Sequence, residues 1–160
     1  MIRFLCFTIL IVGVLTSCDK NRVYDNYKSL PGYWDQDSII SFKVNDLDSL
    51  QTYDLFINLR NTNDYEYSNI YLITEMSFPY GKVVEDTLEY EMAYPDGEWM
   101  GVGIGEVKTS KLWYKKGVRF NEPGTYEFKI RQAMRKNNHR EGIEKLKGIT
   151  EVGLRIEKPE

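Results

Sequence analysis

The sequence has very few of the residues from which metal and redox sites are built. Its 160 residues include two cysteines, Cys6 and Cys18, and one histidine, His139. Both cysteines stand near the start, so the body of the chain has no thiol for a disulfide, a catalytic cysteine or a thiolate metal site. A single histidine also excludes zinc sites built from His and Cys. We therefore expect no cofactor and no metal, with an all-oxygen calcium site as the one metal site that this composition leaves open.

The chain also has no excess of basic residues. Lysine and arginine together number 21, against 24 aspartates and glutamates, which gives a formal net charge of −3. A protein that binds nucleic acid needs a clustered basic face. We therefore expect no nucleic-acid partner.

Motifs for catalysis are missing as well. No Gly-x-Ser-x-Gly elbow is present, and one histidine severely limits any nucleophile and base pair. The glycines within 101–105 alternate with apolar residues, but no Lys-Ser or Lys-Thr follows the last glycine directly and no helix pattern comes after it, so they do not predict a phosphate loop. They indicate a place where another backbone or Trp99 approaches closely. Carboxylates are frequent within 85–91, where alternation puts Glu85, Glu89 and Glu91 on one solvated strand face. We predict that the protein is not an enzyme.

The first residues predict an export signal that ends in a lipid attachment site. Arg3 precedes an apolar run over residues 4–15, and Thr16-Ser17 then leads to Cys18. A basic start, an apolar core and small residues before the cleavage point are typical of a signal peptide. The run is too short for a transmembrane helix, which needs about 20 apolar residues. We predict a lipoprotein signal peptide over 1–17 and acylation of Cys18; an ordinary cleaved signal peptide is the alternative.

Acylation of Cys18 makes the membrane the first partner of the chain. Each buried methylene contributes about 0.8 kcal/mol of membrane affinity, and more than one acyl chain gives stable attachment. We expect a cell-envelope location, at the outer membrane and facing the periplasm.

The mature chain divides into a tether and one domain. Residues 18–37 are polar and show no clear periodicity, so we predict a tether there, with a reach of about 20–25 Å as a flexible coil. Its second half is expected to dock on the domain, with Trp34 packed. Residues 38–160 are predicted to form the domain, and their number suffices for one hydrophobic core.

Alternation of apolar and polar residues predicts an all-β domain. The clearest run is 53–60, where Tyr53, Leu55, Ile57 and Leu59 define one buried face. Similar patterns predict further strands at 40–44, 70–78, 84–92, 112–120, 126–131 and 152–156, with a short helical turn at 141–146. About seven or eight strands separated by polar turns indicate an antiparallel β-sandwich, jelly-roll-like in arrangement.

Aromatic residues make up 14% of the chain and include 12 tyrosines. Tyrosine and tryptophan favour strands and also surfaces that are apolar on one side and wet on the other. Trp99, Trp113 and Tyr67 are the candidate binding surface, which would suit a glycan. Packing in the core is the plainer explanation for each tryptophan, because large aromatics dominate small cores.

A series of short motifs runs through the chain from end to end. They are the lipobox Cys18, Tyr24-Asp25, Trp34, Tyr53 to Arg60, Tyr65 to Leu72 with Tyr67-Ser68-Asn69, Gly97 to Gly101, Phe120 with Pro123 to Tyr126, Gln132-Ala133-Met134-Arg135, and Val152 to Ile156. Each motif is weak alone, but their order is fairly specific, and through it the sequence resembles the gliding motility lipoproteins of the GldH family.

The resemblance implies an envelope lipoprotein linked to the gliding apparatus and its associated protein-secretion system, with no catalytic residues. On this basis we expect a lipid-anchored protein that acts by contact with other envelope or gliding and secretion proteins. An anchored glycan-binding module that uses Trp and Tyr side chains is the alternative. A concave sheet face with an exposed Trp99 or Trp113 would favour the alternative, and burial of all three tryptophans would remove it.

Overall fold

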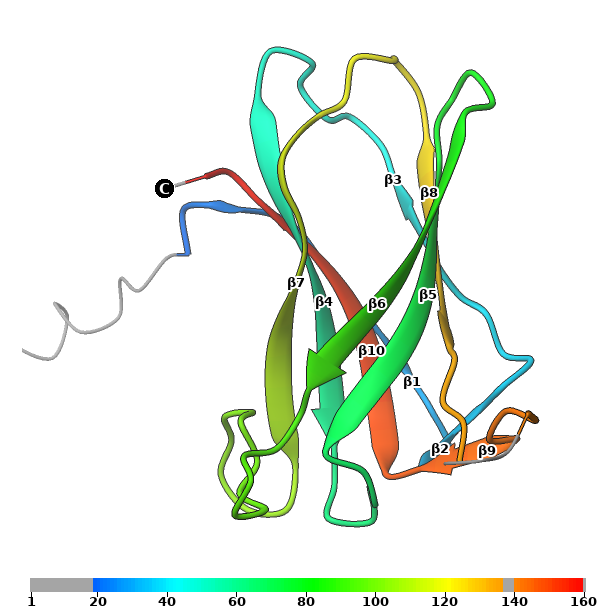
Figure 1. The fold of residues 1–160 in the computed structure, drawn as a ribbon. Coiled ribbons are helices and arrows are strands. Elements are labelled where there is room, and N and C mark those ends of the chain that lie inside the picture. The colour runs from blue at the N-terminus through cyan, green and yellow to red at the C-terminus, as the bar shows by residue number, and fades with distance from the viewer. Residues whose placement is uncertain (1–18, 137–139, 160) are drawn as a thin grey trace, which may run out of the picture.

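The computed structural model describes residues 19–136 and 140–159, and its strands form two main antiparallel sheets packed face to face (Figure 1). The predicted signal peptide, Cys18 and His139 lie outside the described residues. Ten strands and no helix occur in the described part of the chain. They are β1 (Arg22–Ser29), β2 (Tyr33–Asp35), β3 (Ile40–Val44), β4 (Thr52–Asn61), β5 (Asn69–Ser77), β6 (Val83–Glu91), β7 (Lys108–Arg119), β8 (Tyr126–Gln132), β9 (Lys145–Lys147) and β10 (Ile149–Glu157).

The strand order is that of a jelly roll. One sheet has the order β1-β10-β4-β7 and the other β3-β8-β5-β6, while β2 and β9 pair with each other in a small sheet at one end. Among the eight main strands, only β5 and β6 follow each other within one sheet; every other connection crosses between the sheets. This confirms the predicted antiparallel sandwich and its jelly-roll-like arrangement.

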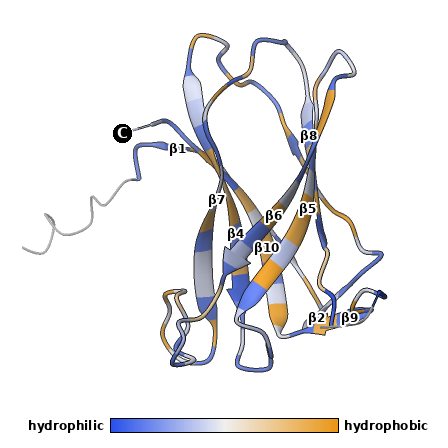
Figure 2. Ribbon diagram, in the orientation of Figure 1, coloured by the Kyte–Doolittle hydropathy of each residue, from blue (hydrophilic) through white to orange (hydrophobic). Residues whose placement is uncertain are grey.

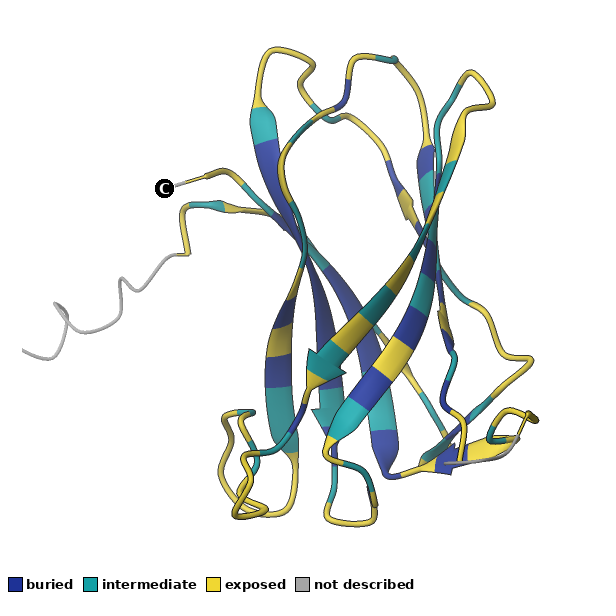
Figure 3. Ribbon diagram, in the orientation of Figure 1, coloured by how far each residue is buried: buried dark blue, intermediate teal, exposed yellow. Residues whose placement is uncertain are grey.

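The core lies between the inner faces of the two sheets. Leu55, Ile57 and Leu59 of β4 and Leu154 of β10 are fully buried there. The apolar side chains of β5 and β8 meet them from the other sheet, and buried residues follow the facing strands (Figures 2 and 3). Burial of this apolar surface is the main source of stability for such a domain.

Strand β4 is buried on both faces, whereas the sequence predicted one buried face. Asp54, Phe56 and Asn58 point away from the core, yet their exposed fractions are only 7, 4 and 3%. Long side chains of the neighbouring strands cover them. The Lys111 ammonium lies 4.0 Å from the centre of the Phe56 ring, and the Trp113 ring lies 4.3 Å from it. The outer face of sheet β1-β10-β4-β7 is therefore a packed layer of its own.

The segment predicted as a tether is instead partly a strand. Residues 22–29 form β1, which pairs with β10 in antiparallel register from Arg22 opposite Glu157 to Ser29 opposite Glu151. The backbone of β10 supplies the hydrogen bonds of this edge strand, so β1 needs few apolar residues and shows no clear alternation. Docking of the second half is as expected, because Trp34 in β2 is fully buried and donates from Nε1 to the Ser38 carbonyl at 3.0 Å.

The helical turn predicted at 141–146 was wrong. Residues 145–147 form β9, whose Leu146 is fully buried opposite Trp34 of β2. The segment is too polar for its single buried leucine to mark a strand by alternation, so only the pairing with β2 defines it.

Arg155 of β10 joins the two ends of the described chain. Its guanidinium group donates to Asp25 of β1 at 2.9 Å and also contacts Asp19 and Glu157. Glu157 in turn accepts a hydrogen bond from the Lys111 ammonium of β7 at 2.8 Å. Charge-assisted bonds of this kind are stronger than neutral ones. The network therefore connects three strands across the outer face of the sheet.

Side chains close the seam between the edge strands β6 and β7. The Tyr90 hydroxyl donates to the Trp113 carbonyl at 2.5 Å, and the Tyr114 hydroxyl donates to Asp86 at 3.0 Å. The Lys115 ammonium lies 2.8 Å from the same Asp86 carboxylate. Burial, together with the charge of Asp86, raises the pKa of Tyr90 to about 12, so this hydroxyl stays a donor at neutral pH. The two sheets are thus fixed to each other without a shared backbone ladder.

A substitution at Gly153 tests how tightly β1 packs on the sheet. A Cβ atom added at Gly153 would lie 2.8 Å from two ring carbons of Tyr27 and 3.1 Å from the Asn26 carbonyl oxygen. We predict that Gly153→Ala lowers the free energy of unfolding by about 1–3 kcal/mol, as overpacking does. Urea unfolding of residues 19–160 measures it. In a double-mutant cycle with Tyr27→Ala, the two losses of unfolding free energy should not add, because Tyr27→Ala removes the ring that the new Cβ atom would crowd. Strict additivity of the two losses would contradict this explanation.

The pKa of Glu157 predicts how the free energy of unfolding depends on pH. Burial raises the pKa of its carboxyl group, but the bonds from Lys111 and Arg155 outweigh burial, so the pKa is lowered from its ordinary value. A lowered folded pKa adds stability above the unfolded pKa, and this stability is lost as the pH falls through the folded pKa. Glu157→Gln should therefore cost about 1 kcal/mol at pH 7 and flatten the decline in stability from about pH 5 to about pH 3.

The matched control for this prediction is Glu106→Gln, which changes an exposed residue of the β6–β7 loop. Urea midpoints across the same pH range should follow the parent chain for this control. Equal slopes for the Glu157 variant and its parent would show that the network does not supply the pH dependence.

Candidate functional site

The described residues hold no group suited to metal chemistry. Within 19–136 and 140–159, no three His, Cys, Asp or Glu side chains come together as a metal site. The same residues contain no helix of the length and apolar character needed to cross a bilayer. Glu85, Glu89 and Glu91 of β6 are exposed, as alternation predicted. The surfaces of the sandwich are therefore the places to look for function.

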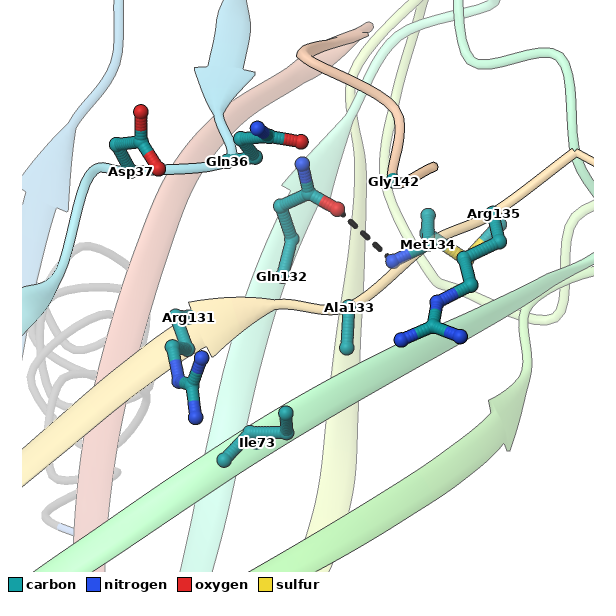
Figure 4. A pocket seen from close by; sticks show the side chains of 9 residues that line it. All are labelled: Gln36, Asp37, Ile73, Arg131, Gln132, Ala133, Met134, Arg135 and Gly142. Atoms are coloured by element: carbon teal, nitrogen blue, oxygen red, sulfur yellow. Dashed lines mark hydrogen bonds between the residues drawn. The ribbon is translucent and has the colours of Figure 1, made fainter. Parts of the chain in front are cut away.

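A pocket opens where β8 ends, on the outer side of sheet β3-β8-β5-β6 (Figure 4). We call it the β8 pocket. Its volume is about 270 Å³. Three parts of the chain that are distant in sequence line it, namely Gln36 and Asp37 after β2, Ile73 of β5, and Arg131 to Arg135 with Gly142 around the end of β8.

Hydrogen bonds to Gln132 shape the wall of the β8 pocket. This residue is 4% exposed, and its amide group donates to the Ile143 carbonyl at 2.6 Å and accepts from the Met134 backbone N–H at 2.9 Å. The Ala133 N–H donates to the Tyr71 carbonyl at 2.8 Å. One buried side chain thus holds both the segment after β8 and the segment that returns toward β9.

Two arginines give the β8 pocket its charge. Figure 4 shows Arg131 and Arg135 on either side of Ala133, with Ile73 beneath them. Both arginines are exposed, and the closest carboxylate oxygen to Arg131 is that of Glu85 at 3.6 Å. The described residues provide no ion pair for Arg135. Planar guanidinium groups bind carboxylates with two parallel hydrogen bonds, so this arrangement can accept an acidic group beside a small apolar contact.

The charges beside the pocket are largely matched. The Lys129 ammonium of β8 lies 2.8 Å from the Glu75 carboxylate of β5. The hydrogen bond from Lys129 lowers the pKa of Glu75, so this carboxylate stays ionised at neutral pH. Glu75 and Lys129 therefore neutralise each other, and the charged residues that line the pocket are Arg131, Arg135 and Asp37, which leaves an excess of one positive charge.

The structure brings together two of the three aromatic residues that the sequence singled out. Tyr67 and Trp99 both pack on Tyr65, with ring centres 5.7 and 6.1 Å from it. Trp99 is partly buried, and its Nε1 donates to Asn63 at 2.9 Å. Trp113 is 53% exposed and stacks on Phe56 at the outer face of the other sheet. The three residues therefore do not form one platform.

The glycines of the β6–β7 loop permit close contact between backbones, as predicted. A Cβ atom at Gly103 would lie 2.3 Å from the Val107 carbonyl oxygen, and one at Gly101 would lie 3.1 Å from the Thr109 carbonyl oxygen. The loop folds back on itself and leaves Val102 and Ile104 exposed. Its glycines thus serve the shape of the loop.

Neither Arg131 nor Arg135 was predicted from the sequence to lie at a pocket, although Arg135 belongs to the motif Gln132-Ala133-Met134-Arg135. Alternation along β8 puts Arg131 on the outer face, which is a usable but common signal. Nothing in the sequence places residues 36–37 and 142 beside the end of β8, because that contact depends on the pairing of β2 with β9.

A substitution at Gln132 tests whether its hydrogen bonds hold the wall of the β8 pocket in place. We predict that Gln132→Met leaves the Ile143 carbonyl and the Met134 N–H unpaired and lowers the free energy of unfolding by about 2 kcal/mol. The backbone N–H of Ile143, which donates to the Met134 carbonyl, should exchange faster with deuterium. Amides at the centre of β4 serve as the internal control. Unchanged exchange at Ile143 would contradict the role given to Gln132.

Comparisons with known proteins agree on one family. The family model described as GldH lipoprotein matches residues 22–156. The chain is 57% identical over 152 residues to the gliding motility lipoprotein GldH homolog of Christiangramia forsetii, covering 95% of this chain and 91% of that protein. It is 48% identical over 144 residues to the gliding motility lipoprotein GldH of Flavobacterium johnsoniae, covering 90% of this chain and 89% of that one.

Among solved structures, the VP2 subviral particle of infectious bursal disease virus matches with a TM-score of 0.39 and 14% identity, over 88% of this chain and 33% of the viral chain. This likeness is too low to support any conclusion. The family model spans every strand from β1 to β10, and both bacterial relatives align over nearly their whole length. The chain therefore belongs to the GldH lipoprotein family.

Proposed function

We propose that this chain is a lipid-anchored, non-enzymatic component of a gliding motility apparatus and its associated secretion system. It acts by contact with another envelope protein. The names of two relatives, which are gliding motility lipoproteins, support the apparatus. Among the described residues, no three His, Cys, Asp or Glu side chains cluster as a metal site, which fits a contact role.

Acylation of Cys18 provides the attachment. Thr16-Ser17-Cys18 is the expected processing site, and the folded body begins a few residues later with β1. The sandwich would then sit in the cell envelope, at the outer membrane and on its periplasmic side.

The β8 pocket is the proposed contact site, and its two arginines are the observation that carries this proposal. Arg131 and Arg135 present guanidinium groups on both sides of Ala133 above the apolar side chain of Ile73. A peptide segment with an acidic residue next to a small apolar one fits this arrangement. Such a segment on a partner protein would bind through paired charge and one apolar contact.

A glycan-binding role has no comparable support. Stacking on sugars requires aromatic rings that share one surface. Trp113 lies on a different part of the sandwich from Tyr67 and Trp99, and Trp99 is partly buried. Trp34 is in the core.

Reversal of charge at the pocket tests the contact. We predict that the double variant Arg131→Glu and Arg135→Glu lowers recovery of the cross-linked partner from the native envelope by at least about tenfold, because each arginine–carboxylate bond contributes about 1.5–3 kcal/mol. Cross-linking in living cells followed by mass spectrometry measures the recovery.

Lys43→Glu is the matched control, since Lys43 is an exposed cation on the same sheet, in β3. It should leave the recovery unchanged, and circular dichroism should show that all variants keep their strands. Full recovery with both arginines reversed would exclude the β8 pocket as the contact site.

A further inference from the structure

The chain leaves the sandwich over the outer face of sheet β1-β10-β4-β7. The Asp19 carboxylate forms an ion pair with Arg155, which points outward from β10. The Lys158 N–H donates to the Asn21 carbonyl at 2.8 Å, so the segment before β1 is also tied to the end of β10. The first described residues therefore lie against this face and do not extend freely from it.

The predicted lipid site is the next residue. Consecutive Cα atoms are about 3.8 Å apart, so Cys18 follows directly from the residue that Arg155 holds. This step rests on the acylation of Cys18 that belongs to the proposed function. With that acylation, the acyl chains begin at the outer face of sheet β1-β10-β4-β7, which must then lie close to the bilayer.

An exposed tryptophan lies on the same face. Asp25, Arg155, Phe56 and Trp113 stand opposite one another across β1, β10, β4 and β7. Neighbouring strands are about 4.8 Å apart, so Trp113 is about 10 Å from Arg155. Trp113 is 53% exposed, and tryptophan is the residue most suited to the boundary between water and lipid.

Lysines surround Trp113. A hollow of about 360 Å³ beside it is lined by Lys111, Lys116 and Lys158 together with Asp54, Phe56, Glu157 and Pro159. Lys111 forms an ion pair with Glu157. Lys116 and Lys158 are exposed to solvent. The Lys116 ammonium lies 5.9 Å from the centre of the Trp113 ring. Long lysine side chains can lay their methylenes along apolar surface and place the ammonium among anionic headgroups.

We propose that this face, centred on Trp113 and flanked by Lys116 and Lys158, lies against the anionic surface of the membrane that holds the anchor. Three observations carry it: the position of Asp19 next to the predicted lipid site, the exposed Trp113, and the three lysines that line the hollow beside it with only two carboxylates. The sandwich then rests with one sheet on the bilayer. The β8 pocket, on the outer side of the other sheet, faces away from the lipid and is open to a protein.

Quenching by brominated lipids tests the orientation. The full acylated chain, purified from a bacterium that processes it, is reconstituted in vesicles of phosphatidylcholine and phosphatidylglycerol with brominated acyl chains. We expect tryptophan emission to be quenched, and Trp113→Phe to lose most of the quenching. Trp99→Phe is the matched control and should keep it. The double variant Lys116→Glu and Lys158→Glu should lose quenching in these vesicles and match the parent when phosphatidylglycerol is left out.

The outcomes separate this inference from the proposed function. Mass spectrometry of the purified chain reports acylation at Cys18; its absence overturns the proposed function and this inference together. An acylated, vesicle-bound chain whose quenching is the same with and without Trp113 overturns the inference alone. Quenching that instead depends on Trp99 would place the other end of the sandwich on the lipid and would likewise overturn it.

Discussion

One guanidinium group, that of Arg155, connects the beginning and the end of the described chain. Its contacts with Asp19, Asp25 and Glu157 bring the residue after the predicted lipid site, the edge strand β1 and the last strand β10 into one network. Arg155 is 16% exposed along its side chain, so these bonds are only partly weakened by solvent. The proposed position of the lipid anchor depends on this network, and so do the proposed membrane side and partner side of the sandwich.

The fold could be predicted from the sequence because most strands obey a period of two. Leu55, Ile57 and Leu59 alternate with Asp54, Phe56, Asn58 and Arg60, of which only Phe56 is apolar, and they occupy the inner face as expected. β1 could not be predicted in this way. Its residues are polar because it is an edge strand whose partner provides the backbone bonds, and Arg155, more than 120 positions later, provides the charge that stabilises Asp25. Pairings over such distances leave no local pattern.

The sites were harder to predict than the fold. Aromatic content drew attention to Tyr67, Trp99 and Trp113, but only the tertiary structure separates Trp113 from the other two. The β8 pocket combines Gln36, Ile73 and Arg135, which meet only because β2 pairs with β9 below the ends of the main sheets. Arginine on a strand face is ordinary in a sequence. Arg131 and Arg135 stand out only in the structure, where Ile73 lies beneath them and the described residues provide no ion pair for Arg135.

With the proposed acylation of Cys18, the few residues between Cys18 and β1 limit how far the sandwich can move from the bilayer. A long flexible linker would let a domain move far from its anchor and contact proteins that are anchored elsewhere. Here the strand pairing begins at Arg22, so few residues are left to act as a linker. With the sulfur acylated, the height of every surface above the bilayer is set by the thickness of two packed sheets, which stack about 10 Å apart. On the proposed location at the outer membrane, a partner anchored in the opposite membrane would have to span the remaining distance itself.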